Sequence, residues 1–177
     1  MKTSIIREAG FEEAMLGLSL SYNSDNDEAY WVAKRLAFKS GGHNKFLESI
    51  AVWIDIAAPR YWWSQFDTYR VGVTKQSEST MHTLTKRPLT SKDFADHVAC
   101  DMVDLMNELI ADNDLQSAKA NLPESFLQRR IVCTNYMALQ RIIRQRRHHK
   151  LIEWQIFCTQ VVIQAEHPEF LEERNDS

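Results

Sequence analysis

The sequence predicts a helix-rich α/β fold, of the α+β kind, in which helices pack on a small sheet within a single domain over residues 1–177. The first observation is that a chain of 177 residues, 44% of them apolar, can bury a core without metal or disulfide support. The second is that apolar residues recur every three or four positions in several segments. The third is a pair of short segments rich in β-branched residues, which favour strands.

In the N-terminal half, the pattern predicts two helices, a strand and a third helix. Apolar residues at helical spacing place the first two helices at Phe11–Tyr22 and Glu28–Phe38. The segment Glu48–Ala57 is interpreted as a strand, with a helix as the alternative. Pro59 suits the first turn of a following helix over Arg60–Tyr69, whose aromatic residues are expected to lie buried between other elements.

The C-terminal half begins with a polar segment that has no usable periodicity and is interpreted as a loop as far as Arg87. A helix capped by Thr90 or Ser91 is predicted to run to about Ala111, and a short helix that carries Lys119 should follow it. Three further elements are expected, namely an extended segment "FLQRRIVCT", a helix from its cap Asn135 to about Arg147, and a helix over Leu151–Ala165.

The net charge of the chain is -3, yet its arginines are concentrated in one stretch near the C-terminus. This contrast indicates a local site for an anionic partner rather than a general nucleic-acid coat. Bidentate, permanently charged guanidinium groups suit phosphate or a planar polar ring. Two alternatives stay open: solvated arginines that complement a helix dipole, and RNA or DNA binding with Tyr61, Trp62 and Trp63 as stacking surfaces, which the net charge disfavours. The stretch contains Arg129, Arg130, Arg141, Arg144, Arg146 and Arg147.

The cysteines and histidines indicate neither a disulfide framework nor a metal site. Cys100, Cys133 and Cys158 are an odd, widely spaced set without a CxxC pair, which favours a reducing cytoplasm. The adjacent residues His148 and His149 cannot face one metal ion together on a helix, so no metal is expected. No apolar run approaches the ~20 residues of a membrane span, and the sequence therefore predicts a soluble protein.

Two loops carry further candidate residues. His43 follows two glycines and could contact a cofactor, although a single loop histidine is equally compatible with a solvated residue. Ser77 and Ser79, in "KQSEST", could offer hydroxyl groups to a phosphate, or belong to an ordinary polar loop. No serine, cysteine or carboxylate has the sequence surroundings of a catalytic nucleophile.

The order of features around Leu122–Trp154 is specific enough to indicate a family. A basic residue precedes a Leu-Pro break, an extended segment with an arginine leads to an asparagine, and the next helix ends in an arginine before a tryptophan. This order resembles the C-terminal half of the flavin-dependent thymidylate synthases, with matching positions at Lys119, Leu122, Pro123, Arg129, Asn135, Leu139, Arg146 and Trp154. Upstream, "GHNKFLESIAVWIDIAAPRYWW" resembles that family's histidine, strand and aromatic helix, with His43 and Arg60 at the matching places.

The resemblance implies an α/β fold, a homotetramer with active sites built from several chains, FAD as the hydride carrier, and deoxyuridine monophosphate as the acceptor of a folate-derived carbon. It assigns the phosphate of the nucleotide to Lys119 and the base to Arg146. The full set of implied substrate contacts is Lys119, Arg129, Arg146, Ser77 and Ser79. The implied flavin contacts are His43, Asn135 and Arg141, the last in place of a polar residue.

The chain departs from the family at its signature. Ser64, Gln65 and Phe66 stand where the family has Arg-His-Arg, and Ser79 stands where it has a nucleotide-binding arginine. Each lost guanidinium leaves phosphate oxygens to weaker donors, which predicts weak FAD binding. Besides nucleic-acid binding, two classes of function stay open: a pyrimidine-nucleotide synthase, and a nucleotide-binding or regulatory protein without catalysis. For a tetramer, the aromatic cluster Tyr61–Trp63 is expected at a subunit interface.

Overall fold

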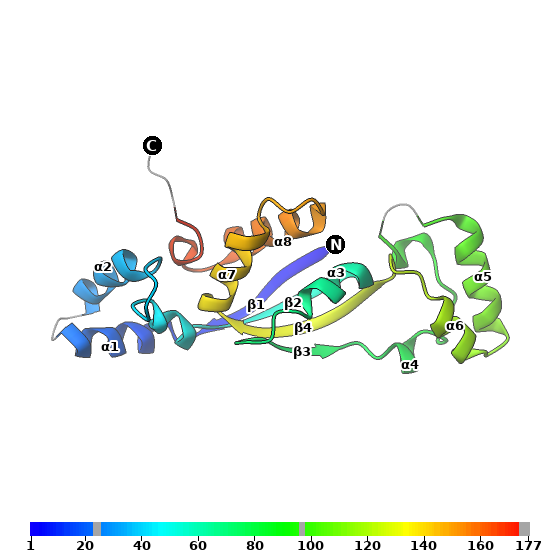
Figure 1. Ribbon diagram of the computed structural model, residues 1–177. Coiled ribbons are helices and arrows are strands. Elements are labelled where there is room, and N and C mark those ends of the chain that lie inside the picture. The colour runs from blue at the N-terminus through cyan, green and yellow to red at the C-terminus, as the bar shows by residue number, and fades with distance from the viewer. Residues whose placement is uncertain (23–25, 96–97, 174–177) are drawn as a thin grey trace.

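A four-stranded antiparallel sheet forms the centre of the protein in this computed structural model, which describes residues 1–22, 26–95 and 98–173. The long strands β2 (Ala51–Pro59) and β4 (Leu127–Asn135) lie side by side and are in register along their whole length. The strand order is β1-β2-β4-β3, so that β1 (Lys2–Ala9) and β3 (Thr74–Ser77) form the two edges (Figure 1).

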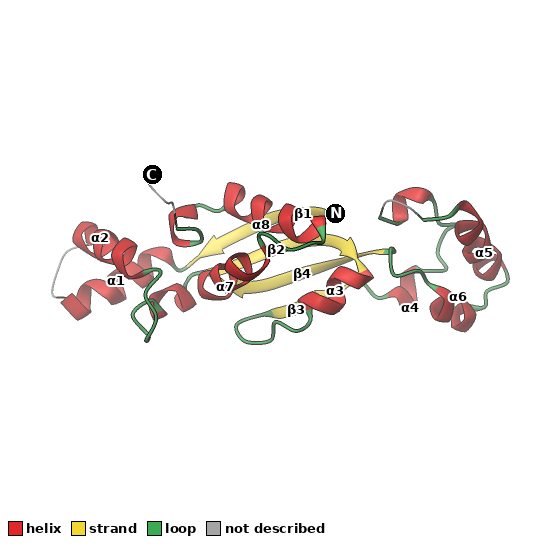
Figure 2. Cartoon of the chain, turned by 45° about the horizontal axis from the view of Figure 1, so that its top comes forward, coloured by secondary structure: helices red, strands yellow, loops and turns green. Residues whose placement is uncertain are grey.

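The two faces of the sheet differ because helices cover only one of them. Along β2, residues alternate between fully buried and half-buried positions, as expected for a strand with one packed face. The helices α3 (Arg60–Phe66), α7 (Tyr136–Arg146) and α8 (Ile152–Gln164) all lie on the packed side (Figures 1 and 2). We call this side the covered face, and the other side, which carries Trp53 and Asp55 of β2, the open face.

The core between the covered face and its helices is dominated by aromatic rings. The ring of Trp62 lies 4.6 Å from that of Trp154 and 4.9 Å from those of Trp63 and Phe66, measured between ring centres. Trp62 and Trp63 are 0% and 1% exposed. The prediction that these tryptophans form a subunit interface is therefore wrong, and so is their use as stacking surfaces for nucleic acid, because neither ring reaches the surface.

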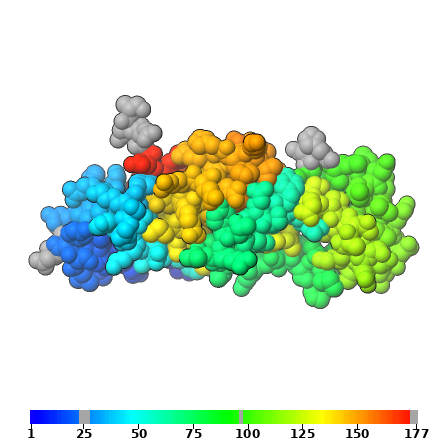
Figure 3. Space-filling view, viewed as in Figure 1, coloured from blue at the N-terminus to red at the C-terminus, as the bar shows by residue number. Residues whose placement is uncertain are grey.

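Helices extend the molecule beyond both ends of the sheet and give it an elongated outline (Figures 1 and 3). At one end lie α1 (Phe11–Tyr22) and α2 (Asn26–Leu36). At the other end lie α4 (Thr80–Thr83), α5 (Cys100–Ala111) and α6 (Leu115–Asn121). This second end has a hydrophobic cluster of its own, which we call the small core and which consists of Leu84, Leu89, Phe94, Met106, Ala118, Leu122 and Phe126.

Most of the elements expected from the sequence are confirmed. The segment for which strand and helix competed is the strand β2, and the predicted helix after Pro59 is α3, which ends three residues earlier than expected. The short helix that carries Lys119 is α6. The helices α1, α2, α7 and α8 also begin and end within two residues of the expected positions. Within the described ranges, no helix is long and apolar enough to cross a membrane.

Three expectations are corrected. The edge strand β1 was not predicted, and the segment interpreted as a loop contains the strand β3 and the short helix α4. The helix expected from Thr90 or Ser91 begins only at Cys100. The reason is that Thr90 and Asp93 close a capping box around a single 3-10 turn, after which Phe94 pairs with Phe126 in a β-bridge.

Candidate functional site

Arg129 lies on the open face of the sheet. Its Nε and Nη2 donate hydrogen bonds to the two carboxylate oxygens of Asp55, at 2.8 and 2.6 Å. These hydrogen bonds lower the pKa of the Asp55 carboxyl. The Arg129 side chain remains 64% exposed. Because α7 lies on the covered face, the structure does not bring Arg129 together with Arg146 within one chain.

Arg130 follows Arg129 in β4 and therefore points to the covered face. Its Nη1 donates to both carboxylate oxygens of Asp67, at 3.0 and 3.1 Å, and its guanidinium carbon lies 4.3 Å from the centre of a Trp63 ring. Only 14% of the side chain is exposed. This arginine is part of the packed structure, so it does not belong to an open anion site.

Arg146, the predicted base contact, is held at the end of α7 by three groups from other parts of the chain. Its guanidinium carbon lies 4.8 Å from the centre of a Trp154 ring, and its Nε donates to the hydroxyl of Tyr69 at 2.7 Å. Nη1 lies 3.5 Å from Oε1 of Gln65. The same Gln65 oxygen accepts a 2.9 Å hydrogen bond from the indole nitrogen of Trp154. No sequence pattern indicates that Gln65 and Tyr69 meet Arg146, because these contacts join residues 77 and 81 positions apart.

Lys119 and the serine loop come together at the junction of the sheet and the small core. The Lys119 ammonium donates to the hydroxyl of Thr80, which is the first residue of α4 and 8% exposed. Ser79 precedes it as an exposed N-cap residue whose side chain makes no capping hydrogen bond. Ser77 is exposed at the end of β3, opposite Arg130. The structure thus brings Lys119 to the segment that carries Ser77 and Ser79, and adds Thr80, which sequence reasoning did not include.

Asn135 and Arg141, two of the predicted flavin contacts, both lie next to the turn at Val71 and Gly72. The side-chain oxygen of Asn135 caps α7 by accepting from the amide of Ala138 at 2.9 Å. Arg141 donates to the carbonyl of Val71 at 3.1 Å. Gly72 has φ +70°, and a Cβ there would lie 3.1 Å from the Asn135 amide nitrogen, so glycine lets the turn approach the cap closely.

His43, the third predicted flavin contact, is remote in sequence and lies at the α1 end of the sheet. Its side chain is exposed and borders a cavity of about 430 Å³ between α1 and the segment that precedes β2. Lys45 supplies a cation to this wall, whereas Glu13 and Glu48 supply carboxylates. Gly17 of α1 leaves open space toward the cavity, because a Cβ there would meet nothing within 4 Å. The cavity therefore has room and a mixed set of charges.

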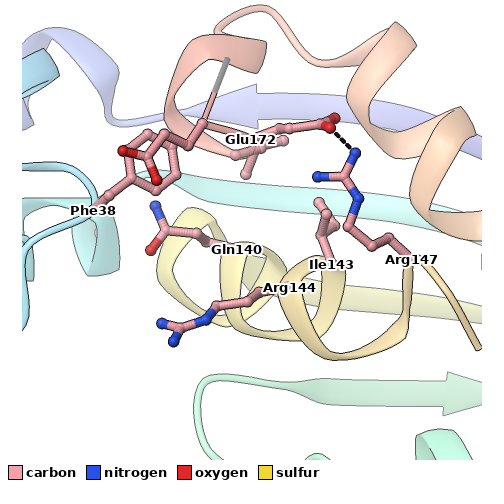
Figure 4. Close-up of a pocket in the computed structure, with 8 residues that line it drawn as sticks. Phe38, Gln140, Ile143, Arg144, Arg147 and Glu172 are labelled. Atoms are coloured by element: carbon pink, nitrogen blue, oxygen red, sulfur yellow. Dashed lines mark hydrogen bonds and ion pairs between the residues drawn. The ribbon is translucent and has the colours of Figure 1, made fainter. Parts of the chain in front are cut away.

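Arg144 of α7, and Arg147 directly after this helix, line a different cavity, of about 480 Å³, shown in Figure 4. Arg147 pairs with Glu172 of the C-terminal segment, while the guanidinium of Arg144 points away from that pair. Gln140 donates to the carbonyls of Ala37 and Phe170, at 3.0 and 2.9 Å, and so ties both cavity walls to α7. The arginine-rich stretch is thus divided among several surfaces and does not form one anion site.

The cysteines are all unpaired, as the sequence predicts. Burial raises the pKa of the Cys158 thiol to about 12, so this group stays protonated at neutral pH and is not an activated nucleophile. In the part of the chain that the structure describes, no three His, Cys, Asp or Glu side chains are grouped so that they could hold a metal ion.

Comparison with known proteins places the fold. No protein-family model matches the sequence, and no curated protein matches it either. Among solved structures, the chain is similar to the flavin-dependent thymidylate synthase ThyX of Helicobacter pylori in complex with FAD and dUMP, with a TM-score of 0.83, 17% identity, and coverage of 98% of this chain and 99% of that one. A second structure of ThyX from that organism, also with FAD and dUMP, gives a TM-score of 0.81 at 16% identity over 98% of each chain. The chain therefore has the same fold as these synthases, as the sequence resemblance predicts.

Proposed function

We propose that the protein is a pyrimidine deoxynucleotide-binding, synthase-like protein that carries out flavin-dependent methyl or hydroxymethyl transfer to a deoxyuridine-type monophosphate. The observation that carries this proposal is the fixed guanidinium of Arg146, which lies against Trp154 at the position where the resemblance expects a base contact. The likeness over 98% of the chain to structures that contain FAD and dUMP supports the same ligands here.

The proposed roles follow the grouping of the side chains. Lys119, with the hydroxyl groups of Ser77 and Ser79, would hold the nucleotide phosphate, since an ammonium beside exposed hydroxyls offers several donors to phosphate oxygens. Arg146 would contact the pyrimidine. Arg129 points away from this layer and would reach a nucleotide only from a neighbouring subunit.

The residues present fit a flavin only in part. We propose that His43, which borders an open cavity, and Asn135 and Arg141, which lie beside one turn, contact the cofactor. When bound, FAD would supply the hydride for the transfer. At the signature positions, however, Phe66 is 1% exposed and the Ser64 hydroxyl donates to the carbonyl of Tyr61. Neither offers a guanidinium to the diphosphate, so we expect FAD to bind weakly.

We further propose that the protein assembles as a homotetramer. The residues around His43, around Arg146 and on the open face lie on different surfaces of one chain, and neighbouring subunits would bring them together. Light scattering at micromolar concentration should therefore give the mass of four chains. A stable monomer would contradict the shared site. From the three unpaired cysteines we infer a reducing, cytoplasmic setting.

The test of the proposed function is a titration of the ligand-free protein with FAD, with and without dUMP, followed by flavin absorbance and fluorescence. Saturable FAD binding in the micromolar range that tightens when dUMP is present would support a site for both ligands. Failure of FAD to bind at millimolar concentration under either condition would remove the flavin from the proposal.

The nucleotide contact has its own test. Arg146→Ala should weaken dUMP binding about tenfold or more, because a charge-assisted hydrogen bond contributes about 1.5–3 kcal/mol. The matched control is Arg144→Ala, an exposed arginine on the same helix that faces the cavity of Figure 4. Unchanged dUMP binding by a folded Arg146→Ala oligomer would remove the assignment.

A second candidate function is a nucleotide-binding or regulatory protein that has lost catalysis. The observation that favours it is the burial of Phe66 in the core at a signature position, because a core aromatic residue cannot be exchanged for a ligand-binding arginine without repacking. Thermal stabilisation by pyrimidine monophosphates alone, with no effect of FAD, would support this candidate over the synthase.

A further inference from the structure

The hydroxyl of Tyr69 and the amide of Gln65 fix the orientation of one arginine. A tyrosine hydroxyl has a single hydrogen, and that of Tyr69 is donated to Oε1 of Gln145 at 2.8 Å. Its oxygen is then free to accept from Nε of Arg146 at 2.7 Å. Gln65 lies on the other side, where its oxygen accepts from the buried indole of Trp154 and faces Nη1 of Arg146.

The direction of each hydrogen bond determines which edge of the guanidinium remains for a ligand. A guanidinium has five N–H groups in one plane. In Arg146, Nε–H is used by Tyr69, and one hydrogen of Nη1 points toward Gln65. Within the described residues, no hydrogen bond involves Nη2. Nη2 therefore keeps both of its N–H groups, and Nη1 keeps one, for a ligand. We call this part of the guanidinium the far edge.

We propose that Tyr69 and Gln65 are positioning residues, which hold Arg146 over the Trp154 ring so that its far edge meets a carbonyl oxygen of a pyrimidine ring. This inference rests on the proposed function and specifies how the proposed site recognises the base of its substrate. A carbonyl oxygen has two lone pairs and can accept from these N–H groups, whereas an exocyclic amino group of a base is itself a donor. Bases that present a carbonyl in the plane of the guanidinium are therefore favoured.

The two positioning residues lie at the signature positions of this chain or just after them. Gln65 stands where the resemblance expects the histidine of Arg-His-Arg, and Tyr69 lies four residues later, beyond the end of α3. Tyr69 is 7% exposed and packs edge-on against Trp154, with 5.9 Å between the ring centres. A buried ring with one defined hydrogen-bond direction fixes the arginine more firmly than solvent would, because little rotamer freedom is left to lose on binding.

The experiment measures dUMP binding by calorimetry in Tyr69→Phe, which keeps the packed ring and removes only the hydroxyl. We expect about tenfold weaker binding, from the loss of one hydrogen bond that orients a charged group. The matched control is Tyr61→Phe, in the same helical region, whose hydroxyl donates to Glu153. Gln65→Leu should also weaken binding, and Gln65→Glu, which keeps the acceptor, should restore it. Wild-type affinity in a folded Tyr69→Phe protein would overturn the proposal.

A second readout separates this inference from the proposed function. In NMR spectra of the intact protein, the Nε–H of Arg146 should exchange slowly with water, and Tyr69→Phe should abolish that protection. If the wild type binds no dUMP but shows this protection, the positioning contact stands and the proposed substrate is wrong. If the Arg146 Nε–H exchanges as fast as that of the exposed Arg144, the positioning role is refuted whatever the protein binds.

The alternative is that the far edge of Arg146 binds an anion, and inorganic phosphate serves as the probe for it. A phosphate affinity that falls in Tyr69→Phe would overturn the pyrimidine assignment.

Discussion

The aromatic core over the sheet and the small core beyond its end are held together in different ways. In the aromatic core, large rings pack on one another across α3 and α8, and the contacts join residues up to 95 positions apart. The small core is built on an irregular chain that polar side chains tie in place. There, Asn107 of α5 accepts from the amide of Leu89 at 2.6 Å and donates to its carbonyl at 3.0 Å. Ring packing thus stabilises strands and helices in the aromatic core. In the small core, side-chain hydrogen bonds stabilise the segment between α4 and α5, which has little regular secondary structure.

The difference can be measured because the tryptophans report on one region only. The five tryptophans are Trp31, Trp53, Trp62, Trp63 and Trp154, and none lies between residues 80 and 126, where the small core is formed. Tryptophan fluorescence therefore follows the sheet region, whereas far-ultraviolet circular dichroism follows the helices of both regions. If residues 1–177 unfold as one domain, the two signals should give one transition.

The largest effect is expected for Trp62→Ala. The side chain is fully buried among other rings, and its removal leaves a cavity that the neighbouring side chains cannot fill. We expect the free energy of unfolding to fall by about 3–5 kcal/mol. Guanidinium chloride titrations would measure it, with fluorescence and circular dichroism shifting together. A loss below about 1 kcal/mol would show that the ring cluster is not the main support of the fold.

The corresponding change in the small core is Met106→Ala. Met106 is fully buried in α5, so the loss should be about 2–5 kcal/mol, toward the lower end because fewer large side chains surround it. In a single domain, the fluorescence transition moves with the circular dichroism transition although no tryptophan is near. A shift in circular dichroism alone would show that the small core unfolds separately, which would contradict the single-domain prediction.

A smaller effect distinguishes two adjacent tryptophans in the aromatic core. The indole nitrogen of Trp63 donates to the carbonyl of Gln128 at 2.8 Å, whereas that of Trp62 is buried without a hydrogen-bond partner in the described part of the chain. Trp63→Phe should therefore be more destabilising than Trp62→Phe by about 0.5–1.5 kcal/mol, because it also removes a hydrogen bond. Equal losses in thermal unfolding would indicate that the Trp63 hydrogen bond contributes little.

The two regions also differ in how far the sequence could predict them. Helix α7 was predictable because its signals are local: Asn135 caps it, and buried residues follow at helical spacing. Around the small core, Thr90 and Ser91 gave the same kind of start signal, but the capping box of Thr90 and Asp93 closed on one 3-10 turn. Whether a helix continues beyond its cap depends on the packing of Phe94 against Phe126, a contact between distant segments.

The candidate site likewise combines features that local sequence patterns predict with features that depend on contacts between distant segments. Period-two alternation places Arg129 and Arg130 on opposite faces of β4, but two adjacent arginines give no indication of which face helices cover. The edge strand β3, with the sequence TKQS, has no apolar alternation that could reveal it. The contacts of Gln65 and Tyr69 with Arg146 exist only after α3 and α7 pack on the same face of the sheet. Sequence order could suggest Arg146 as a ligand contact, but not the groups that orient it.

The smallest predicted effect concerns the polar ties of the small-core region at acid pH. Arg87 donates to both carboxylate oxygens of Asp93, at 2.9 and 2.5 Å, and the amide of Thr90 adds a third hydrogen bond. The Arg87 hydrogen bonds, with those from Thr90, lower the pKa of Asp93 from 3.8 to about 2.

Because the pKa of Asp93 is lower in the folded state, the stabilisation is present above about pH 4 and is lost as the pH falls toward 2. Arg87 is 60% exposed, so solvent screening keeps the contribution of this ion pair small. Asp93→Asn should therefore destabilise the protein at pH 7, with a difference from wild type that shrinks toward zero near pH 2. Asp55→Asn, which breaks the ion pair with Arg129 on the open face, is the comparison in the sheet region. Urea titrations at both pH values would decide, and a loss from Asp93→Asn that is the same at pH 7 and pH 2 would assign its role to shape rather than charge.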